Sequence, residues 1–231
     1  MEKYLILQYD NRILSSNYKK LVYINKQYCL RHKYNYLFLN NHYDLPTYWV
    51  KVYLVYILLL TNKYKGILWI DTDACVHNFD IRLEDILIPN KHFYKSSDHI
   101  LRPASFNAGV FLVLNTEIGK KLMLDWLNTY DKNNWEKINN KWVSKCKWAG
   151  YCYEQGSFIK NISKKYNKYI YDLNWYFFQS NYYTIYEKKC IFIVHFSGNN
   201  FKNQIPKYLK FLKDKKQTIK NYCRINKTLK I

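Results

Sequence analysis

The chain has 231 residues, of which 48% are hydrophobic, and its 37 Lys and Arg against 17 Asp and Glu give a formal charge of +20. This length favours one domain, and the hydrophobic share excludes a disordered chain. The lysines are spread along the sequence and match no nucleic-acid-binding module. The charge therefore predicts a general affinity for polyanions, and sequence-specific DNA recognition is not the favoured interpretation.

The sequence offers no membrane signal. Its first residues lead directly into a strand pattern without the apolar core of a signal peptide. Residues 50–60 form the most apolar stretch, which is too short to cross a bilayer and contains Lys51. We therefore expect a cytoplasmic protein.

The cysteines show neither a C-x-x-C pair nor zinc spacing, so free thiols are favoured over a disulfide framework. The pairing of Cys146 with Cys152, which are the only two close in sequence, stays open. The six are Cys29, Cys75, Cys146, Cys152, Cys190 and Cys223.

Strands and helices alternate over the first third of the chain. Apolar runs predict strands at Tyr4–Gln8, Tyr34–Leu39 and Gly66–Ile70, and helical spacing predicts helices at Leu14–His32 and Pro46–Leu60. This order is typical of an α/β fold with a mostly parallel, Rossmann-like central sheet, right-handed crossovers and flanking helices.

The remaining elements are predicted from weaker patterns. They belong to one continuous domain, residues 1–214, which is followed by a basic tail, residues 215–231. The predicted strands are residues 92–97, Ser105–Asn115 and Ile191–Phe196; the predicted helices are Ile81–Ile86, Glu117–Tyr130 capped by Thr116, a helix from Glu154 or Gln155 through Ile162, and Pro206–Lys213; Asp131–Gly150 is predicted to be an irregular loop.

Two carboxylates, Asp71 and Asp73, follow the strand Gly66–Ile70 at once. In extended chain, residues two apart point the same way, and ligands of open α/β sheets bind beyond the carboxyl ends of strands. A divalent cation bound by oxygen would relieve the repulsion between the two charges. The alternative is that both aspartates only cap a turn or the next helix.

His195, at the end of a later predicted strand, is a candidate third metal ligand, or else a histidine hydrogen-bonded at a strand end. Lys202 and Lys51 are candidates to neutralise a diphosphate, or ordinary surface lysines. The pairs Asn107–Gly109 and Glu154–Gln155 offer amide and carboxyl groups for sugar hydroxyls, or caps for the next element.

Taken in order, these motifs resemble a GT-A nucleotide-sugar glycosyltransferase. The resemblance is closest to the fungal and plant galactosyl/xylosyltransferase family, and extends to bacterial lipopolysaccharide α-galactosyltransferases and glycogenins. The motifs that carry it are Trp49-Val-Lys51, Leu68-Trp-Ile-Asp71-Thr-Asp73-Ala, Asn107-Ala-Gly109-Val, Glu154-Gln155 and His195-Phe-Ser-Gly198, and the match runs from about Tyr4 to Lys202.

The resemblance implies a role for each matched residue. It implies that Asp71, Asp73 and His195 hold a divalent ion, manganese rather than magnesium, on the diphosphate of a UDP-sugar, and that Lys202 stabilises the departing UDP. The other implied donor contacts are Lys51, Thr72, Asn107, Ala108, Gly109 and Gly198, with Gln155 and Glu154 at the transferred sugar and acceptor, and Gln8, Tyr9 and Arg12 at the uridine.

The expected reaction moves a hexosyl or pentosyl group to a hydroxyl of a glycan or protein acceptor. No side chain of the motifs is an obvious strong base or carboxylate nucleophile, so we expect retention of configuration by same-face attack. The alternatives are a sugar nucleotidyltransferase, which normally needs a glycine-rich loop after the first strand, and a basic protein that binds nucleic acid or membrane surfaces without catalysis. The basic tail is expected to contact anionic surfaces.

Overall fold

The structure is a computed structural model that describes residues 3–98, 104–186 and 190–215. Its strands are β1 (Leu5–Tyr9), β2 (Asn35–Leu39), β3 (Gly66–Ile70), β4 (Ala74–Val76), β5 (Phe93–Ser96), β6 (Val110–Leu114), β7 (Trp135–Ile138), β8 (Lys141–Ser144), β9 (Ile170–Leu173) and β10 (Ile193–His195). Its α-helices are α1 (Ser16–His32), α2 (Thr47–Leu60), α3 (Glu117–Leu127), α4 (Glu154–Ser157), α5 (Trp175–Phe178) and α6 (Asn199–Lys202), and residues 205–215 are also helical.

Six strands form the central sheet in the order β2-β1-β3-β6-β5-β9. All neighbours run parallel except β6, which is antiparallel to both β3 and β5. The predicted α/β class with a mostly parallel sheet is confirmed. Because β6 is reversed, the chain enters it at the edge where β1, β3, β5 and β9 end, so residues before β6 lie beside those that follow β3.

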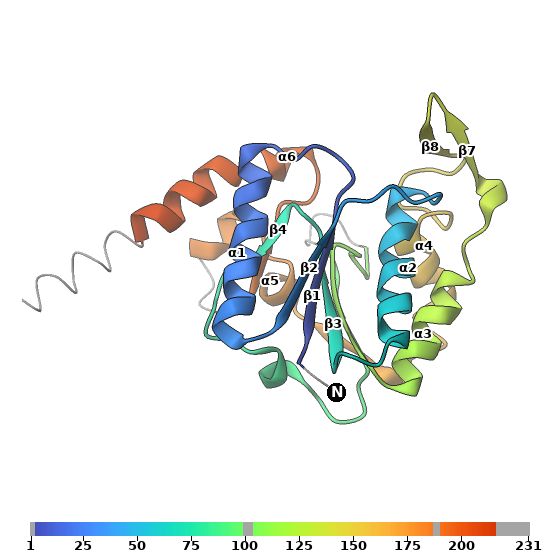
Figure 1. Ribbon diagram of the computed structural model, residues 1–231, viewed down its shortest axis with the longest axis horizontal. Coiled ribbons are helices and arrows are strands. Elements are labelled where there is room, and N and C mark those ends of the chain that lie inside the picture. The colour runs from blue at the N-terminus through green and yellow to red at the C-terminus, as the bar shows by residue number, and fades with distance from the viewer. Residues whose placement is uncertain (1–2, 99–103, 187–189, 216–231) are drawn as a thin grey trace, which may run out of the picture.

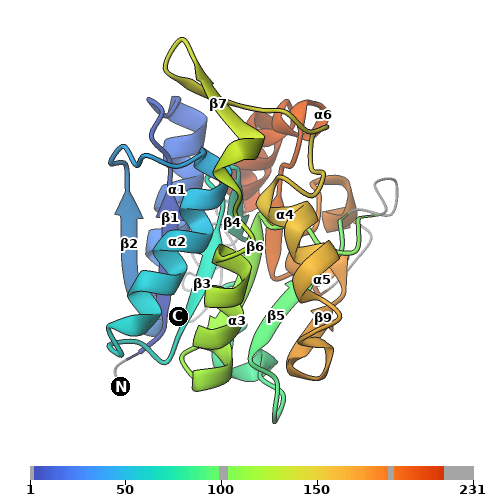
Figure 2. The same ribbon diagram turned by 90° about the vertical axis from the view of Figure 1, so that its right-hand side faces the viewer.

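Helices cover both faces of the sheet, because successive residues of a strand point to opposite sides. Ile67 and Trp69 of β3 pack in one core with α2 and α3, whereas Leu68 and Ile70 pack in the other core with Tyr28 of α1. Figures 1 and 2 show α1 on one side of the sheet and α2 and α3 on the other. A sheet buried on both faces explains why its strands are continuous apolar runs.

A second, two-stranded sheet stands at the carboxyl edge of β3. There β4 pairs antiparallel with β10, so that His195 lies opposite Ala74. Asn25 of α1 is fully buried and holds the other edge of β4, since its side-chain amide donates to the Ala74 carbonyl at 3.0 Å and its oxygen accepts from the Val76 amide at 2.9 Å. This small sheet joins the chain after β3 to a strand more than a hundred residues later.

The prediction of an irregular loop over Asp131–Gly150 was wrong. Strands β7 and β8 pair there as a hairpin, which projects from the body in Figure 1. Its turn residues, Asn139 and Asn140, both have positive φ, 49° and 59°, a conformation that Asn tolerates well and that suits a two-residue hairpin. The polar, Lys- and Asn-rich composition hid the strands.

The structure pairs Cys146 with Cys152 as a disulfide beyond this hairpin, the pairing that the sequence left open. Cys29 and Cys75 are buried free thiols, as expected, and Cys190 is free and exposed.

The later predicted elements have shorter counterparts in the structure. The predicted strands Ser105–Asn115 and Ile191–Phe196 contain β6 and β10, and the predicted helix Ile81–Ile86 contains only a 3-10 turn at Leu83–Ile86. The Thr116 cap is confirmed, because its hydroxyl accepts from the Gly119 amide at 3.0 Å. The predicted tail lies, from residue 216, outside the described residues. In the part of the chain that the structure describes, no helix has the length and apolar character that crossing a membrane requires.

Candidate metal and diphosphate site

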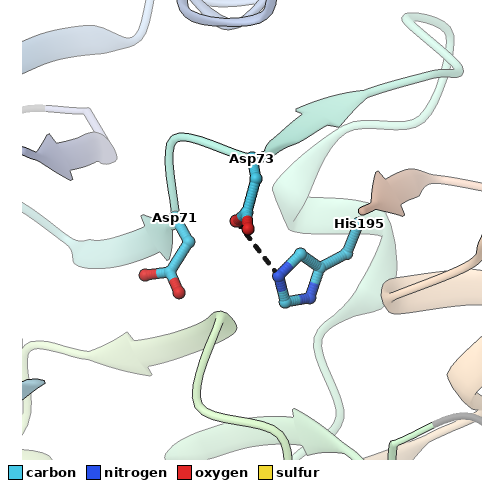
Figure 3. A group of neighbouring side chains, drawn as sticks. All are labelled: Asp71, Asp73 and His195. Carbon is cyan, nitrogen blue, oxygen red and sulfur yellow. Dashed lines mark ion pairs between the residues drawn. The ribbon is translucent and has the colours of Figure 1, made fainter. Parts of the chain in front are cut away.

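Asp71, Asp73 and His195 converge at the carboxyl edge of β3 (Figure 3). The two aspartates lie in the turn between β3 and β4, which is closed by the Ala74 amide donating to the Asp71 carbonyl at 3.0 Å. His195 ends β10, and the pairing of β10 with β4 brings it next to Asp73. One ligand atom from each of the three side chains lies within 4.8 Å of the other two.

The carboxylate of Asp71 is fixed by two donors from the same side of the sheet. Trp69 Nε1 donates to Oδ1 at 2.7 Å, and Lys51 Nζ of α2 donates to both oxygens at 2.9 and 3.2 Å. The backbone of Asp71 is held as well, since Gln8 Nε2 lies 3.3 Å from its carbonyl oxygen. The direction of this carboxylate is therefore set before any ligand arrives.

Lys51 is enclosed by protein groups rather than presented to solvent. Its ammonium lies 3.5 Å from Glu154 Oε1 and 3.1 Å from the carbonyl oxygen of Ala108, in addition to Asp71. Burial by itself lowers the pKa of Lys51, but the charges of Asp71 and Glu154 outweigh burial and raise it. Burial raises the pKa of Glu154, which Lys51 partly offsets. The charge of Lys51 thus neutralises internal carboxylates.

Asp73 lies between an imidazole and an ammonium group. Its Oδ1 lies 3.3 Å from His195 Nε2 and its Oδ2 lies 3.5 Å from Lys202 Nζ. Burial raises the pKa of Asp73, but the hydrogen bond from His195 and the charges of His195 and Lys202 lower it overall. Burial lowers the pKa of His195, but Asp73 raises it overall.

Gly198 brings Lys202 back over the site. It has φ 77° and ψ 162°, a conformation that residues with a Cβ rarely adopt, and it turns the chain from β10 into α6. The Lys202 side chain is 33% exposed, so its ammonium faces both Asp73 and solvent. The structure thus places Lys202 beside Asp73, and its contact with a diphosphate stays a prediction.

The segment Asn107–Gly109 enters β6 directly beside the three ligands. The side-chain oxygen of Asn107 accepts from the Gly109 amide at 2.8 Å, and the oxygen of Gln155 accepts from the Ala108 amide at 3.0 Å. Both side-chain oxygens thus serve the backbone of this turn. The structure brings Asn107, Gln155 and the metal-ligand candidates together, as the motifs predicted.

The residues predicted to receive uridine lie at the end of β1, and they differ in accessibility. Gln8 is fully buried and accepts from the Tyr36 hydroxyl at 2.9 Å, and Tyr9 is buried against Tyr43. Arg12 is the exposed member, with 68% of its side chain accessible. It donates from Nε and Nη2 to Asp10 at 2.8 and 2.7 Å.

Asp10 is a site residue that the sequence did not single out. Besides Arg12 it accepts from the Thr72 hydroxyl at 2.7 Å, which ties the end of β1 to the turn that carries the paired aspartates. Burial raises the pKa of Asp10, but the hydrogen bonds from Arg12 and Thr72 lower it overall. Its position directly after a buried strand was the signal that could have identified it.

Gln179 was also missed. Its side-chain oxygen lies 2.8 Å from His195 Nδ1, on the far side of the ring from Asp73. It follows the short helix α5 in an aromatic stretch without clear periodicity, so no local pattern pointed to it.

The donor set fits a divalent cation. Two carboxylates and an imidazole, gathered on one side of a buried sheet edge, are ligand types shared by magnesium and manganese sites, and imidazole favours manganese. One ligand atom of each of the three side chains lies within 4.8 Å of the other two, so a single cation between them could contact all three.

Comparisons with known proteins give similarity in structure but not in sequence: no family model matches the chain, and no curated protein does. A glycosyltransferase involved in the glycosylation of the major capsid of PBCV-1 is similar over 90% of this chain and 100% of its own, with a TM-score of 0.69 and 14% identity. The glycosyltransferase GlyE of Streptococcus pneumoniae TIGR4 is similar over 86% of this chain and 56% of its own, with a TM-score of 0.50 and 15% identity.

The bifunctional glycosyltransferase WbbM is similar over 84% of this chain and 45% of its own, with a TM-score of 0.50 and 11% identity. The chain thus spans about half the length of GlyE and WbbM. At these identities the likeness establishes the fold, and this chain has the GT-A type of α/β fold found in these glycosyltransferases.

Proposed function

We propose that this protein is a metal-dependent glycosyltransferase that moves a hexosyl or pentosyl group from a UDP-sugar to a hydroxyl of a glycan or protein. The observation that carries the proposal is the convergence of Asp71, Asp73 and His195 at the carboxyl edge of β3. The glycosyltransferase-like fold supports it, as does the motif resemblance to the galactosyl/xylosyltransferase family. We propose residues 1–214 as the catalytic unit.

In this proposal Asp71, Asp73 and His195 hold the ion, manganese or else magnesium. When bound, the ion would supply Lewis-acid stabilisation of the negative charge on the departing diphosphate. Lys202 adds a second positive charge, because its ammonium lies near Asp73 and is partly exposed. Lys51 acts one step away, by orienting Asp71 and balancing Glu154.

The uridine is proposed to lie over the end of β1. Arg12 is the accessible side chain there, whereas Gln8 and Tyr9 are buried and support the surface from below. The link from Asp10 to Thr72 would couple the nucleoside position to the metal turn. Asn107, Gly109 and Gln155 then border the transferred sugar.

Retention of configuration is the proposed stereochemistry. Glu154, the carboxylate nearest to Gln155 in sequence, is buried and ion-paired with Lys51, which makes it a poor nucleophile. Same-face attack by the acceptor hydroxyl, while the leaving group is stabilised by charge, needs no such nucleophile. Proton NMR of the product decides this, since an inverted anomeric centre contradicts it.

The acceptor is proposed to approach along the same sheet edge, past Asn107. The backbone amide of Asn107 donates to the Ser96 carbonyl at 3.1 Å, which joins the metal side of the sheet edge to the end of β5. A cavity of about 380 Å³ opens there, bordered by Lys95, Asp172 and Trp175 among other side chains. Charged groups beside an aromatic ring are suited to a sugar or a polar peptide.

Thermal stability with ligands tests the function. The melting temperature should rise when Mn²⁺ and one member of a panel of UDP- and GDP-sugars are added, and not when the sugar nucleotide is added with a chelator. The matched variant Asp73→Asn should lose the response while remaining folded. Absence of any nucleotide-dependent shift in the wild-type protein, with loss of all polyanion binding at moderate salt, would instead indicate a non-catalytic basic protein.

A further inference from the structure

Gln179 links the start of β6 and the end of β5 to His195. Its carboxamide is buried, and its Nε2 donates to the Asn107 carbonyl at 2.8 Å, to Ser96 Oγ at 3.1 Å and, more weakly, towards the Val110 carbonyl at 3.4 Å. Its Oε1 lies 2.8 Å from His195 Nδ1. The amide thus faces the backbone of the sheet on one side and the imidazole on the other.

These contacts fix which end of the amide faces the ring. The carbonyl oxygens of Asn107 and Val110 can only accept hydrogen bonds, so the amide nitrogen must face them. The amide oxygen therefore faces His195 and can only accept, which requires Nδ1 to carry a proton. A protonated ring also donates from Nε2 to Asp73, and loss of that proton leaves the lone pair on Nε2, the nitrogen that faces Asp73.

The ring has little freedom to turn away from this arrangement. The His195 amide donates to the Ser180 carbonyl at 2.7 Å, and the Ser180 amide donates to the Ile193 carbonyl at 3.0 Å, so the residue after Gln179 is paired to β10. On another side the imidazole packs on the backbone of Gly109, where even a Cβ would overlap it. The backbone of Ser180 and the side chain of Gln179 therefore both hold His195 in place.

We infer that Gln179 is a positioning residue that keeps the proton of His195 on Nδ1 and so presents Nε2 as the metal-binding atom. The role of Gln179 at a metal ligand rests on the proposed function, which supplies the assumption that a metal binds here. Hydrogen-bond partners of this kind orient a ligating imidazole, and their loss typically lowers metal affinity by about 10- to 100-fold.

The first experiment needs neither metal nor substrate. Long-range proton–nitrogen NMR of the metal-free protein, at a pH where the ring is neutral, reports which nitrogen of His195 is protonated; the His195→Gln spectrum assigns the signal. We expect the proton on Nδ1 in the wild-type protein and a mixture of both tautomers in Gln179→Met. A proton on Nε2 in the wild-type protein overturns the inference.

The second experiment measures Mn²⁺ binding by calorimetry. We expect Gln179→Met to bind Mn²⁺ about 10- to 100-fold more weakly than the wild-type protein. The matched control is Asn115→Leu, which removes a buried amide that donates to the Tyr64 carbonyl just beyond the opposite end of β6 from His195, and should bind as the wild type does.

Wild-type affinity in Gln179→Met, or an equal loss in Asn115→Leu, overturns the inference because the effect would then be absent or merely structural. Should Gln179→Met not fold, the wild-type NMR result still decides. Should the wild-type protein bind no Mn²⁺, the proposed function fails, whereas the tautomer measurement judges Gln179 independently.

Discussion

A Cβ atom added to Gly109 would lie 2.1 Å from Cε1 of His195 and 2.8 Å from its Nε2. The imidazole therefore occupies the space where any other residue would place its first side-chain carbon. Gly109 is needed because the backbone entering β6 and the end of β10 approach this closely, and not for an unusual backbone angle. The glycine of the Asn-Ala-Gly motif thus serves the histidine of a motif that lies 86 residues further along.

Gly109→Ala should displace His195 and weaken Mn²⁺ binding by about tenfold or more, because the ligand nitrogen moves while both aspartates stay. The overlap should also lower the free energy of unfolding by about 1–3 kcal/mol. Calorimetry with Mn²⁺ and urea denaturation measure the two effects. In the double variant Gly109→Ala/His195→Ala the space for the methyl group returns. The loss in free energy of unfolding should therefore be smaller than the sum of the losses in the two single variants, while Mn²⁺ binding stays weak.

Lys51→Met should be strongly destabilising, by about 3–5 kcal/mol, because it leaves the carboxylates of Asp71 and Glu154 close together without their cation. Urea denaturation measures this loss. Adding Glu154→Gln to the variant should restore part of the stability, since one of the two unpaired charges is then removed. A stable Lys51→Met protein with weakened UDP binding would show instead that this lysine serves the donor directly.

Lys202→Ala should lower kcat for transfer by about 10- to 100-fold through the loss of one charge at the leaving group. Mn²⁺ affinity should be unchanged or higher, because a positive charge 3.5 Å from Asp73 Oδ2 competes with the ion. Lys207→Ala is the matched control, an exposed lysine near Lys202 in sequence, and should behave as the wild type does. A fall in Mn²⁺ affinity without a change in kcat contradicts the assignment.

His77 should make stability depend on pH. Burial, together with the charge of Lys215, lowers its pKa from 6.5 to about 4, and its Nδ1 lies 3.1 Å from the Tyr208 hydroxyl. Since the folded pKa is depressed, the unfolded chain takes up a proton first as the pH falls below 6.5, and stability is lost progressively down to about pH 4.

The loss at His77 between pH 7 and pH 5 should be on the order of 1–2 kcal/mol. Urea denaturation at both pH values measures it, with His77→Phe as the comparison, because phenylalanine keeps the aromatic packing and cannot titrate. An equal pH dependence in the two proteins would assign the effect to other groups.

The sequence determined the α/β class and one half of the site. Alternating apolar runs and helical spacing are local signals, because burial of a strand or of one helix face is written in neighbouring residues. The same holds for Asp71 and Asp73, since their place depends only on where β3 ends. For His195 and Lys202 the residue pattern predicted only a strand and an order of motifs, and the structure places both beside Asp73.

Only the tertiary structure decided how these groups are held. The reversal of β6, the enclosure of Lys51 between Asp71 and Glu154, and the contact of Gln179 with His195 join residues distant in the chain. Hydrogen bonds and ion pairs between such residues leave no periodicity in the sequence, because each depends on the three-dimensional approach of two segments rather than on the pattern within either one.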